Sequence, residues 1–158
     1  MKRLSVRTLV VLGGLTALAG VGGYAFAQSG QPTPADYVAF RQRVMKLNGA
    51  SWQEAQAKLK AGNAEAVALN AETMAILATW IPGMFPPGSM TSDSKAKPDI
   101  WEKRSEFDAA AKNFQAQAEK LRDAARSKDA AATQAVAKDF GRLACGGCHT
   151  PFRVPPKS

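Results

Sequence analysis

Residues 98–125, PDIWEKRSEFDAAAKNFQAQAEKLRDAA, carry the clearest structural signal in the chain. Large apolar residues recur every seven positions, and the residue four positions after each of them is small in all repeats but the first. The large residues are Ile100, Phe107, Phe114 and Leu121, and the residues that follow them are Arg104, Ala111, Ala118 and Ala125. Such alternation along one face is typical of antiparallel helices packed closely at a crossing angle of about 20°. We therefore expect a long helix that opens at Pro98.

An earlier helix is expected from Pro34 to about Lys60. Thr33 is a suitable N-cap, Pro34 suits the first turn, and Asp36 places an acid there. Asn48-Gly49 could end this helix, but the inward positions keep a spacing of three or four residues through it. This favours one helix over two shorter ones, which remain the alternative. The inward positions are Val38, Arg41, Met45, Asn48, Trp52, Ala55 and Leu59.

The composition is that of an all-α protein. The 158 residues are 46% hydrophobic and 8% aromatic, and alanine, which favours helix, is abundant. Two more helices are expected, over 64–79 and from Ala130 to near Pro151, and a proline- and glycine-rich loop should run to Lys97. Short loops within the outer pairs and one long central loop predict an antiparallel up-down-up-down four-helix bundle.

The first 27 residues have the pattern of a cleaved secretory leader. Basic residues at positions 2, 3 and 7 precede a charge-free stretch, and Ala25-Phe26-Ala27 offers the small-x-small pattern that a signal peptidase accepts. A retained membrane anchor is the alternative, but the stretch is glycine-rich and weakly apolar. We expect a leader over 1–27, a polar lead-in over 28–33 and one domain over 34–158. Export places the protein in the periplasm of a bacterium.

The motif that carries the chemistry is Cys145-Gly146-Gly147-Cys148-His149, the C-x-x-C-H signal for covalent attachment of a c-type haem. Two thiols one helical turn apart can form thioethers with the vinyl groups on one edge of the porphyrin, and His149 then supplies the proximal iron ligand. The two glycines keep side chains away from the macrocycle. One covalent haem c per chain is therefore expected, on the last helix of the bundle.

Two other chemistries remain open for the paired cysteines. A redox disulfide of this spacing usually starts a helix after a strand, and no strand pattern precedes Cys145. A zinc or soft-metal thiolate site would need further ligands, but the chain has only 2 cysteines and 1 histidine. Haem attachment is the stronger hypothesis, because the motif, the leader and the helical context agree.

A methionine can fill the sixth iron position, since the chain has no second histidine. The candidates after the leader are Met45, Met74, Met84 and Met90. Met84 and Met90 lie in the Pro/Gly loop, whereas Met45 lies on the inward face of its helix, where a bundle holds a ligand rigidly. Core filling is the other interpretation of Met45, because methionine packs irregular gaps well. Spacing alone favours neither interpretation.

Three stretches resemble the class II cytochromes c, the family that includes cytochrome c′. They are FRQRVMK at 40–46, KPDIW at 97–101, and the CGGCH motif followed by Phe152-Arg153. The resemblance covers nearly all of the chain after the leader, and it implies a haem between the helices of a four-helix bundle. It also implies that Arg41 lies near a haem propionate and Arg153 lies by the proximal histidine. Pro151 departs from many relatives and should weaken the helix before Arg153.

The resemblance implies one of two iron sites. In cytochrome c′ the iron is five-coordinate, and an apolar distal pocket binds NO or CO. In the low-spin cytochrome c-556 branch a methionine of the first helix is the sixth ligand. Met45 stands at the matching position, and both the Met45-Lys46 pair and the Ile100-Trp101 stretch are more similar to the low-spin branch. We therefore expect axial ligation by His149 and Met45.

These features predict a one-electron carrier and not an enzyme, with a five-coordinate protein that binds NO or CO as the alternative. The net charge is +8, or +5 once the leader with its three basic residues is removed, and it predicts salt-sensitive attraction to acidic patches on redox partner proteins of a respiratory or photosynthetic chain. The alternative is that this charge serves solubility alone. Weak contact with an anionic membrane surface is a further option. Nucleic acid binding is not expected, because the basic residues are spread over helix faces. The resemblance allows a monomer or a homodimer.

Overall fold

The computed structural model describes residues 30–155, and the regular elements in this range are helical. The expected leader and its cleavage site lie outside the described residues. No helix within residues 30–155 is both long enough and apolar enough to cross a membrane. The elements are α1 (Pro34–Lys60), α2 (Val67–Trp80), η1 (Pro82–Met84), α3 (Asp99–Glu102), α4 (Arg104–Arg126), α5 (Ala130–Phe140), the π-helical η2 (Gly141–Gly146) and α6 (Gly147–Phe152).

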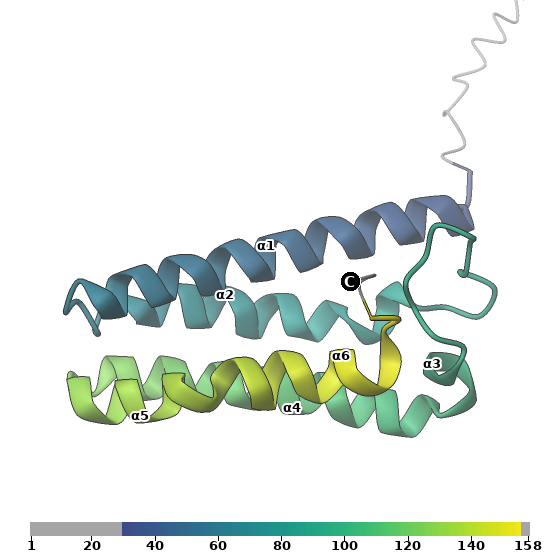
Figure 1. Ribbon diagram of the computed structural model, residues 1–158. Helices are drawn as coiled ribbons and strands as arrows, with labels where there is room; N and C mark the ends of the chain where they lie inside the picture. The colour runs from purple at the N-terminus through teal and green to yellow at the C-terminus, as the bar shows by residue number, and fades with distance from the viewer. Residues whose placement is uncertain (1–29, 156–158) are drawn as a thin grey trace, which may run out of the picture. The chain divides into compact units, whose positions relative to one another are not determined.

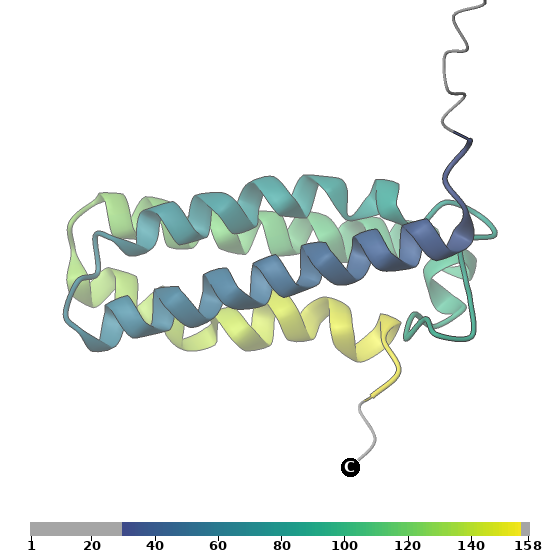
Figure 2. The same cartoon turned by 90° about the horizontal axis from the view of Figure 1, so that it is seen from above.

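The long elements α1, α2, α4 and the continuous C-terminal run of α5, η2 and α6 alternate in direction (Figure 1), which confirms the up-down-up-down four-helix bundle. α2 packs against α1 and α4, and α4 also packs against the C-terminal run. Seen from above, α1 lies along the C-terminal run and α2 lies along α4 (Figure 2). The cavities described below lie between α1 and the C-terminal run.

α1 is one continuous helix through Gly49, so the alternative of two shorter helices is wrong. It starts with a capping box: Thr33 Oγ1 accepts from the Asp36 N–H at 3.2 Å, and Asp36 Oδ2 accepts from the Thr33 N–H at 2.8 Å. The buried face is rotated slightly from the expected one, because Met45 and Trp52 are only half-buried. Both side chains line cavities instead of filling the core.

α2 begins at Val67, later than the expected residue 64. Residues 64–66 form a turn in which Asn63 Oδ1 accepts from the Ala66 N–H at 3.3 Å. The helix continues to Trp80, close to its expected end. The difference is therefore confined to the first turn, where an asparagine side chain competes for the backbone.

The helix expected to run unbroken from Pro98 is interrupted at Lys103, where the backbone takes φ −115° and ψ 48°. That part of the prediction is wrong. The seven-residue repeat nevertheless holds across the break, because Ile100 in α3 and Phe107 in α4 are both buried.

Side chains on both sides of this break donate hydrogen bonds to the loop after α2. Trp101 Nε1 donates to the Pro86 carbonyl at 3.0 Å. Arg104 donates from Nη1 to the Phe85 carbonyl and from Nη2 to the Pro82 carbonyl, both at 2.9 Å. The loop thus obtains partners for its carbonyl groups from residues distant in sequence, which local periodicity does not reveal.

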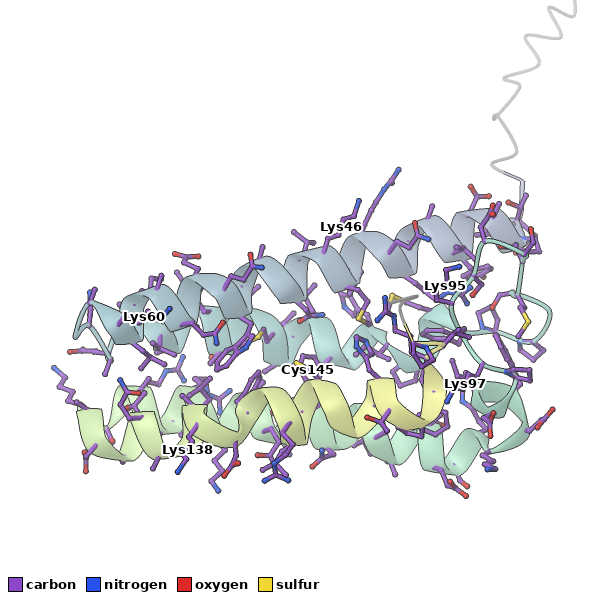
Figure 3. All side chains as sticks on the ribbon, viewed as in Figure 1. Lys46, Lys60, Lys95, Lys97, Lys138 and Cys145 are labelled. Carbon is purple, nitrogen blue, oxygen red and sulfur yellow. The ribbon has the colours of Figure 1, made fainter. Side chains whose placement is uncertain are left out.

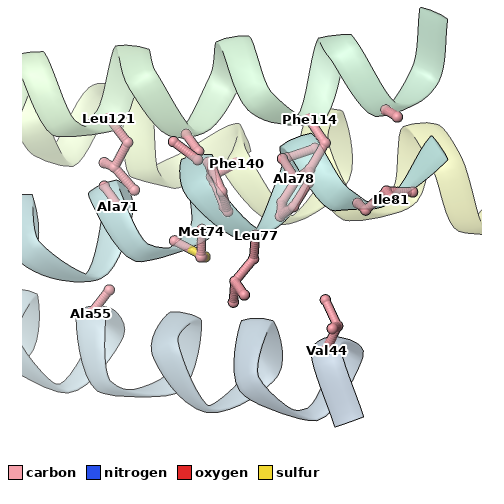
Figure 4. Packing of buried hydrophobic residues seen from close by; sticks show 14 of the residues in the cluster. Val44, Ala55, Ala71, Met74, Leu77, Ala78, Ile81, Phe114, Leu121 and Phe140 are labelled. Carbon is pink, nitrogen blue, oxygen red and sulfur yellow. The ribbon is translucent and has the colours of Figure 1, made fainter. Parts of the chain in front are cut away.

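The core confirms the alternation of large and small residues on α4. Phe107, Phe114 and Leu121 are buried, and so is Ala118 between the last two. Figure 4 shows Phe114 and Leu121 packed with Phe140 of α5 against α2, where small residues allow a close approach. The labelled residues of α2 in this view are Ala71, Met74, Leu77 and Ala78.

The C-terminal run starts at Ala130 and ends at Phe152, close to the expected limits, but it is not one α-helix. Its middle, η2, is π-helical, so this turn is wider than an α-helical one and shifts the phase of α6 relative to α5. Asn113 Nδ2 of α4 donates to the Leu143 carbonyl of η2 at 2.9 Å. Pro151 lies inside α6, which ends one residue later.

Candidate functional site

A largely apolar cavity of about 420 Å³ lies between α1, the loop before α3 and the end of α6. A smaller cavity of about 120 Å³ adjoins it, and the two share Met45, Ile81, Cys148 and His149 as lining residues. The larger volume falls within the roughly 300–1,000 Å³ typical of cofactor sites. The main apolar walls are Val38, Phe85, Ile100, Phe107 and Phe152 in the larger cavity and Trp52, Met74 and Phe114 in the smaller one.

The three chemistry-bearing residues of the CGGCH motif meet at these cavities. Cys145 ends up in η2, while Cys148 and His149 belong to α6. Cys145 lines the smaller cavity, and the other two line both. The cysteines are half-buried and carry free thiols. The motif thus presents two thiols and one imidazole to a single apolar space.

Burial controls the protonation of these groups. Desolvation raises the pKa of Cys145, and desolvation together with the neighbouring Cys145 raises the pKa of Cys148 to about 11. Both are therefore protonated thiols at neutral pH. Desolvation, aided by the positive charge of Arg153, lowers the pKa of His149 and favours the neutral imidazole. A neutral imidazole is the form that ligates iron.

The described residues give no support to a simple metal site. Within 30–155 no group of three or more His, Cys, Asp or Glu side chains is placed to hold a metal ion. A tetrahedral zinc site needs four ligands, or three and a water. The thiol–metal alternative therefore lacks the ligands that it requires in this part of the chain.

Of the methionines considered as iron ligands, Met45 is the one that shares both cavities with His149. Its half-buried side chain lines both cavities from α1, and His149 lines the same two from α6. Met74 is fully buried and lines the smaller cavity. Met84 is buried under the loop, Met90 is exposed on it, and neither lines these cavities.

Arg41 is buried at the wall of the larger cavity and is tied to the loop between η1 and α3. Its terminal nitrogens donate to the Met84 carbonyl at 3.3 Å, to Ser89 Oγ at 3.0 Å and to the Ser89 carbonyl at 2.8 Å, with Ser94 Oγ at 3.5 Å. The guanidinium also lies 4.5 Å from the ring centroid of Phe85. Desolvation lowers the pKa of Arg41 but leaves it charged at neutral pH.

Arg153 lies directly after α6 and lines the larger cavity. Its N–H donates to the His149 carbonyl at 3.1 Å, and its backbone pairs with Ala96 in an isolated bridge. Lys97 N–H donates to the Phe152 carbonyl at 3.0 Å, so the end of α6 is bonded to the loop before α3. Pro151 therefore does not displace Arg153 from the side of His149.

Sequence reasoning missed several residues that build the site. Ser89 and Ser94 hold Arg41, and Asn113 bonds the widened turn of η2. Trp52 is among the expected inward positions of α1, but the spacing does not predict that it lines the smaller cavity and packs on Phe140 with ring centroids 4.6 Å apart. Serine and asparagine in polar segments carry no pattern that marks them in advance, and only the fold brings them to their partners.

Known proteins match this chain over most of the expected domain. A family model described as "Cytochrome C'" matches residues 36–153. The chain belongs to the cytochrome c′ family. It is 33% identical to cytochrome c′ of Pararhodospirillum photometricum over 125 residues, which are 77% of this chain and 98% of that protein. It is 36% identical to cytochrome c-556 of Agrobacterium tumefaciens over 118 residues, 72% of this chain and 93% of that one.

The fold agrees with this membership of the cytochrome c′ family. A nitric oxide complex of a mutant cytochrome c prime from Alcaligenes xylosoxidans superposes with a TM-score of 0.71 and 25% sequence identity, covering 80% of this chain and all of that one. The family binds covalently attached haem, so haem c is the cofactor of this chain. The apolar cavities, the two protonated thiols and the neutral imidazole fit this group.

Proposed function

We propose that the protein is a periplasmic one-electron carrier with haem c attached to Cys145 and Cys148 and the iron held by His149 and Met45. The observation that carries the proposal is that Met45 of α1 and His149 of α6 line the same two cavities. Two ligands on separate helices of one bundle are held by packing, not by a mobile loop. When bound, the haem supplies a ferric/ferrous couple.

The residues of this chain set the properties of that couple. Two ligands on rigid helices favour the same coordination in both oxidation states, so electron exchange requires little rearrangement. Thioether ligation raises the reduction potential, and the apolar walls limit contact of the iron with water. We propose that Arg41 serves as the charge partner of a propionate while it holds the loop, and that Arg153 stays beside His149 and favours its neutral form.

The absorption spectrum of the reduced protein tests the axial ligation. We expect sharp α and β bands and no rapid change with CO. Met45→Leu conserves side-chain volume but removes the thioether, so it should give broad high-spin bands and a ready CO complex. Met74→Leu is the matched control and should keep the wild-type spectrum. An unchanged spectrum in Met45→Leu would assign the sixth ligand elsewhere.

The second candidate function is a five-coordinate protein that binds NO or CO. The apolar side chains of Trp52, Met74 and Phe114 around this site support it, because they would keep water away from a diatomic ligand of the iron. The matching cytochrome c prime from Alcaligenes xylosoxidans forms a nitric oxide complex. Broad bands and a rapid CO complex in the unmodified protein would establish this function and exclude Met45 as a ligand.

Export is part of the proposal, with the leader 1–27 removed after Ala27. The mass of the protein purified from a periplasmic extract tests it. We expect one mass, equal to the chain from Gln28 plus one haem. A mass that includes residues 1–27 would indicate a retained anchor, and a mass without haem would contradict the carrier.

We further propose a homodimer formed through the outer faces of α1 and α2. Five large apolar side chains are exposed there, and the rings of Phe40 and Trp80 stack with centroids 6.2 Å apart. A contiguous apolar face is characteristic of an interface, and a second copy offers the same face in a two-fold pairing. The five residues are Phe40, Leu47, Leu69, Ile76 and Trp80.

A further inference from the structure

Ten of the basic side chains within residues 30–155 take part in none of the ion pairs, and they are not spread evenly over the bundle. Most carboxylates on α2, α3 and α4 are paired; Glu72, for example, receives both Arg122 and Arg126. Within residues 30–155, six basic side chains around the C-terminal run take part in none of the ion pairs. They are Lys46, Lys60, Lys95, Lys97, Lys138 and Arg153, and they are called the cationic face below.

These cations surround the haem-attachment residues. Figure 3 shows Lys46 and Lys60 on α1, Lys138 on the facing C-terminal run, and Lys95 and Lys97 at the end of the loop, with Cys145 between them. Lys46, Lys95 and Arg153 line the larger cavity, whose lining contains no carboxylate.

The cationic face continues along the bundle. Lys60 and Lys138 line a further groove of about 830 Å³ between α1 and α5, which contains no carboxylate among its lining residues. Trp52 lines both this groove and the smaller cavity at Cys145. The cations other than Lys97 therefore line two cavities that flank the smaller cavity at Cys145 and share lining residues with it.

We propose that the cationic face is the docking surface for an electron-transfer protein that presents a cluster of carboxylates around its own redox centre. This inference rests on the proposed carrier function. Unpaired cations around a concave site attract an anionic surface and orient it during encounter. Docking here would place the partner beside Cys145 and Cys148, the residues that would hold the haem, so that one electron could pass from the reduced centre of one protein to the oxidised centre of the other.

The shape of the face favours a protein over a lipid bilayer. Membrane-surface binding uses apolar side chains that protrude between the cations and enter the headgroup region. Here the cations border cavities, and five of the eight exposed large apolar side chains of the described residues lie on the outer faces of α1 and α2. Two others, Leu143 and Val154, lie on the C-terminal run or just after it, too few for an apolar surface that enters a bilayer. A convex carboxylate-bearing surface therefore fits this face better than a flat bilayer.

Paired charge-reversal variants of the haem-loaded protein test the assignment. The double variant Lys60→Glu, Lys138→Glu changes one lysine on each wall of the cationic face, and neither residue lines the cavities at the haem-attachment residues. The matched control, Lys112→Glu with Lys120→Glu, makes the same change in net charge at two exposed lysines of α4. Identical reduced spectra in all three proteins show that the haem environment is intact.

The probe is a gold surface coated with carboxylate-terminated alkanethiol, at low ionic strength. Adsorption, measured by mass, should weaken about tenfold in the face variant and stay within about twofold in the control. Equal weakening in both variants would overturn the proposal, because net charge alone would then govern binding. Binding to phosphatidylglycerol vesicles but not to the carboxylate surface would overturn it in favour of a membrane.

Voltammetry on the same surface separates this inference from the carrier function. Adsorbed wild-type protein that gives a reversible one-electron wave supports both. Selective adsorption through the cationic face without any wave supports the docking surface and contradicts the carrier. A wave of unchanged size in the face variant contradicts the docking surface and leaves the carrier standing.

Discussion

Arg41 is a buried cation whose hydrogen-bond partners are all uncharged. Its terminal nitrogens bind two loop carbonyls and two serine hydroxyls, and only 5% of the residue is exposed. A buried charge is tolerated when several hydrogen bonds replace water. The residue that the family resemblance associates with a propionate therefore also fixes the loop that covers the larger cavity.

We expect Arg41→Gln to lower the free energy of unfolding by about 2–3 kcal/mol, because the carbonyls of Met84 and Ser89 lose charged donors. Limited proteolysis should also cut the loop faster. Arg43→Gln, on an exposed position of the same helix, is the control and should change little. Urea unfolding of both holoproteins provides the measurement, and equal stability of the two variants would contradict this role.

Gly147 has room for a side chain among the atoms of the chain itself. It has helical backbone angles, and a Cβ there would lie 3.5 Å from Asn113 Nδ2, an ordinary contact distance. Gly147→Ala should therefore stabilise the holoprotein by about 0.5–1 kcal/mol with an unchanged spectrum.

Gly62 provides the contrasting position, because its φ of +76° is one that only glycine adopts easily. Gly62→Ala should destabilise the protein by about 1 kcal/mol. Thermal unfolding of the two holoprotein variants provides the measurement: the melting temperature should rise in Gly147→Ala and fall in Gly62→Ala. Loss of haem from Gly147→Ala would contradict this prediction and show that a side chain there obstructs the macrocycle.

At the scale of elements, sequence reasoning succeeded where the signal is local. Thr33, Pro34 and the spacing through Gly49 specify α1, and the alternation from Phe107 onward specifies α4. Sequence reasoning failed where residues distant in sequence bond to the backbone and change the local helix. The break at Lys103 accompanies hydrogen bonds to the loop after α2, and the π-helical turn η2 is bonded by Asn113 of another helix.

The capping box makes the start of α1 sensitive to one hydroxyl. Thr33→Ala should cost about 1 kcal/mol of unfolding free energy, whereas Thr33→Ser keeps the acceptor and should cost much less.

Hydrogen bonds from Thr33 lower the pKa of Asp36. The stabilisation by this carboxylate is therefore present above its ordinary pKa and is lost as the pH falls through the lowered value. Urea unfolding at neutral and acid pH checks both statements.

At the scale of the whole molecule, α1 contributes to two surfaces of different character. Phe40 and Leu47 belong to the apolar face shared with α2, while Lys46 and Lys60 belong to the cationic face shared with the C-terminal run. Net charge and composition are visible in the sequence. The separation of apolar and basic side chains onto two sides of α1 is not visible there, because it depends on which helices become neighbours of α1.

A dimer formed through the apolar face leaves the cationic face available for a partner, because the two surfaces lie on different sides of α1. Ile76→Glu places a carboxylate within the apolar face, and the two-fold pairing brings its copy nearby. The dissociation constant should rise at least about tenfold. Met90→Glu, at an exposed methionine of the loop, is the control and should sediment as the wild type does. Sedimentation equilibrium across micromolar concentrations decides the matter, since a wild-type protein that is monomeric throughout would assign the apolar face to another partner.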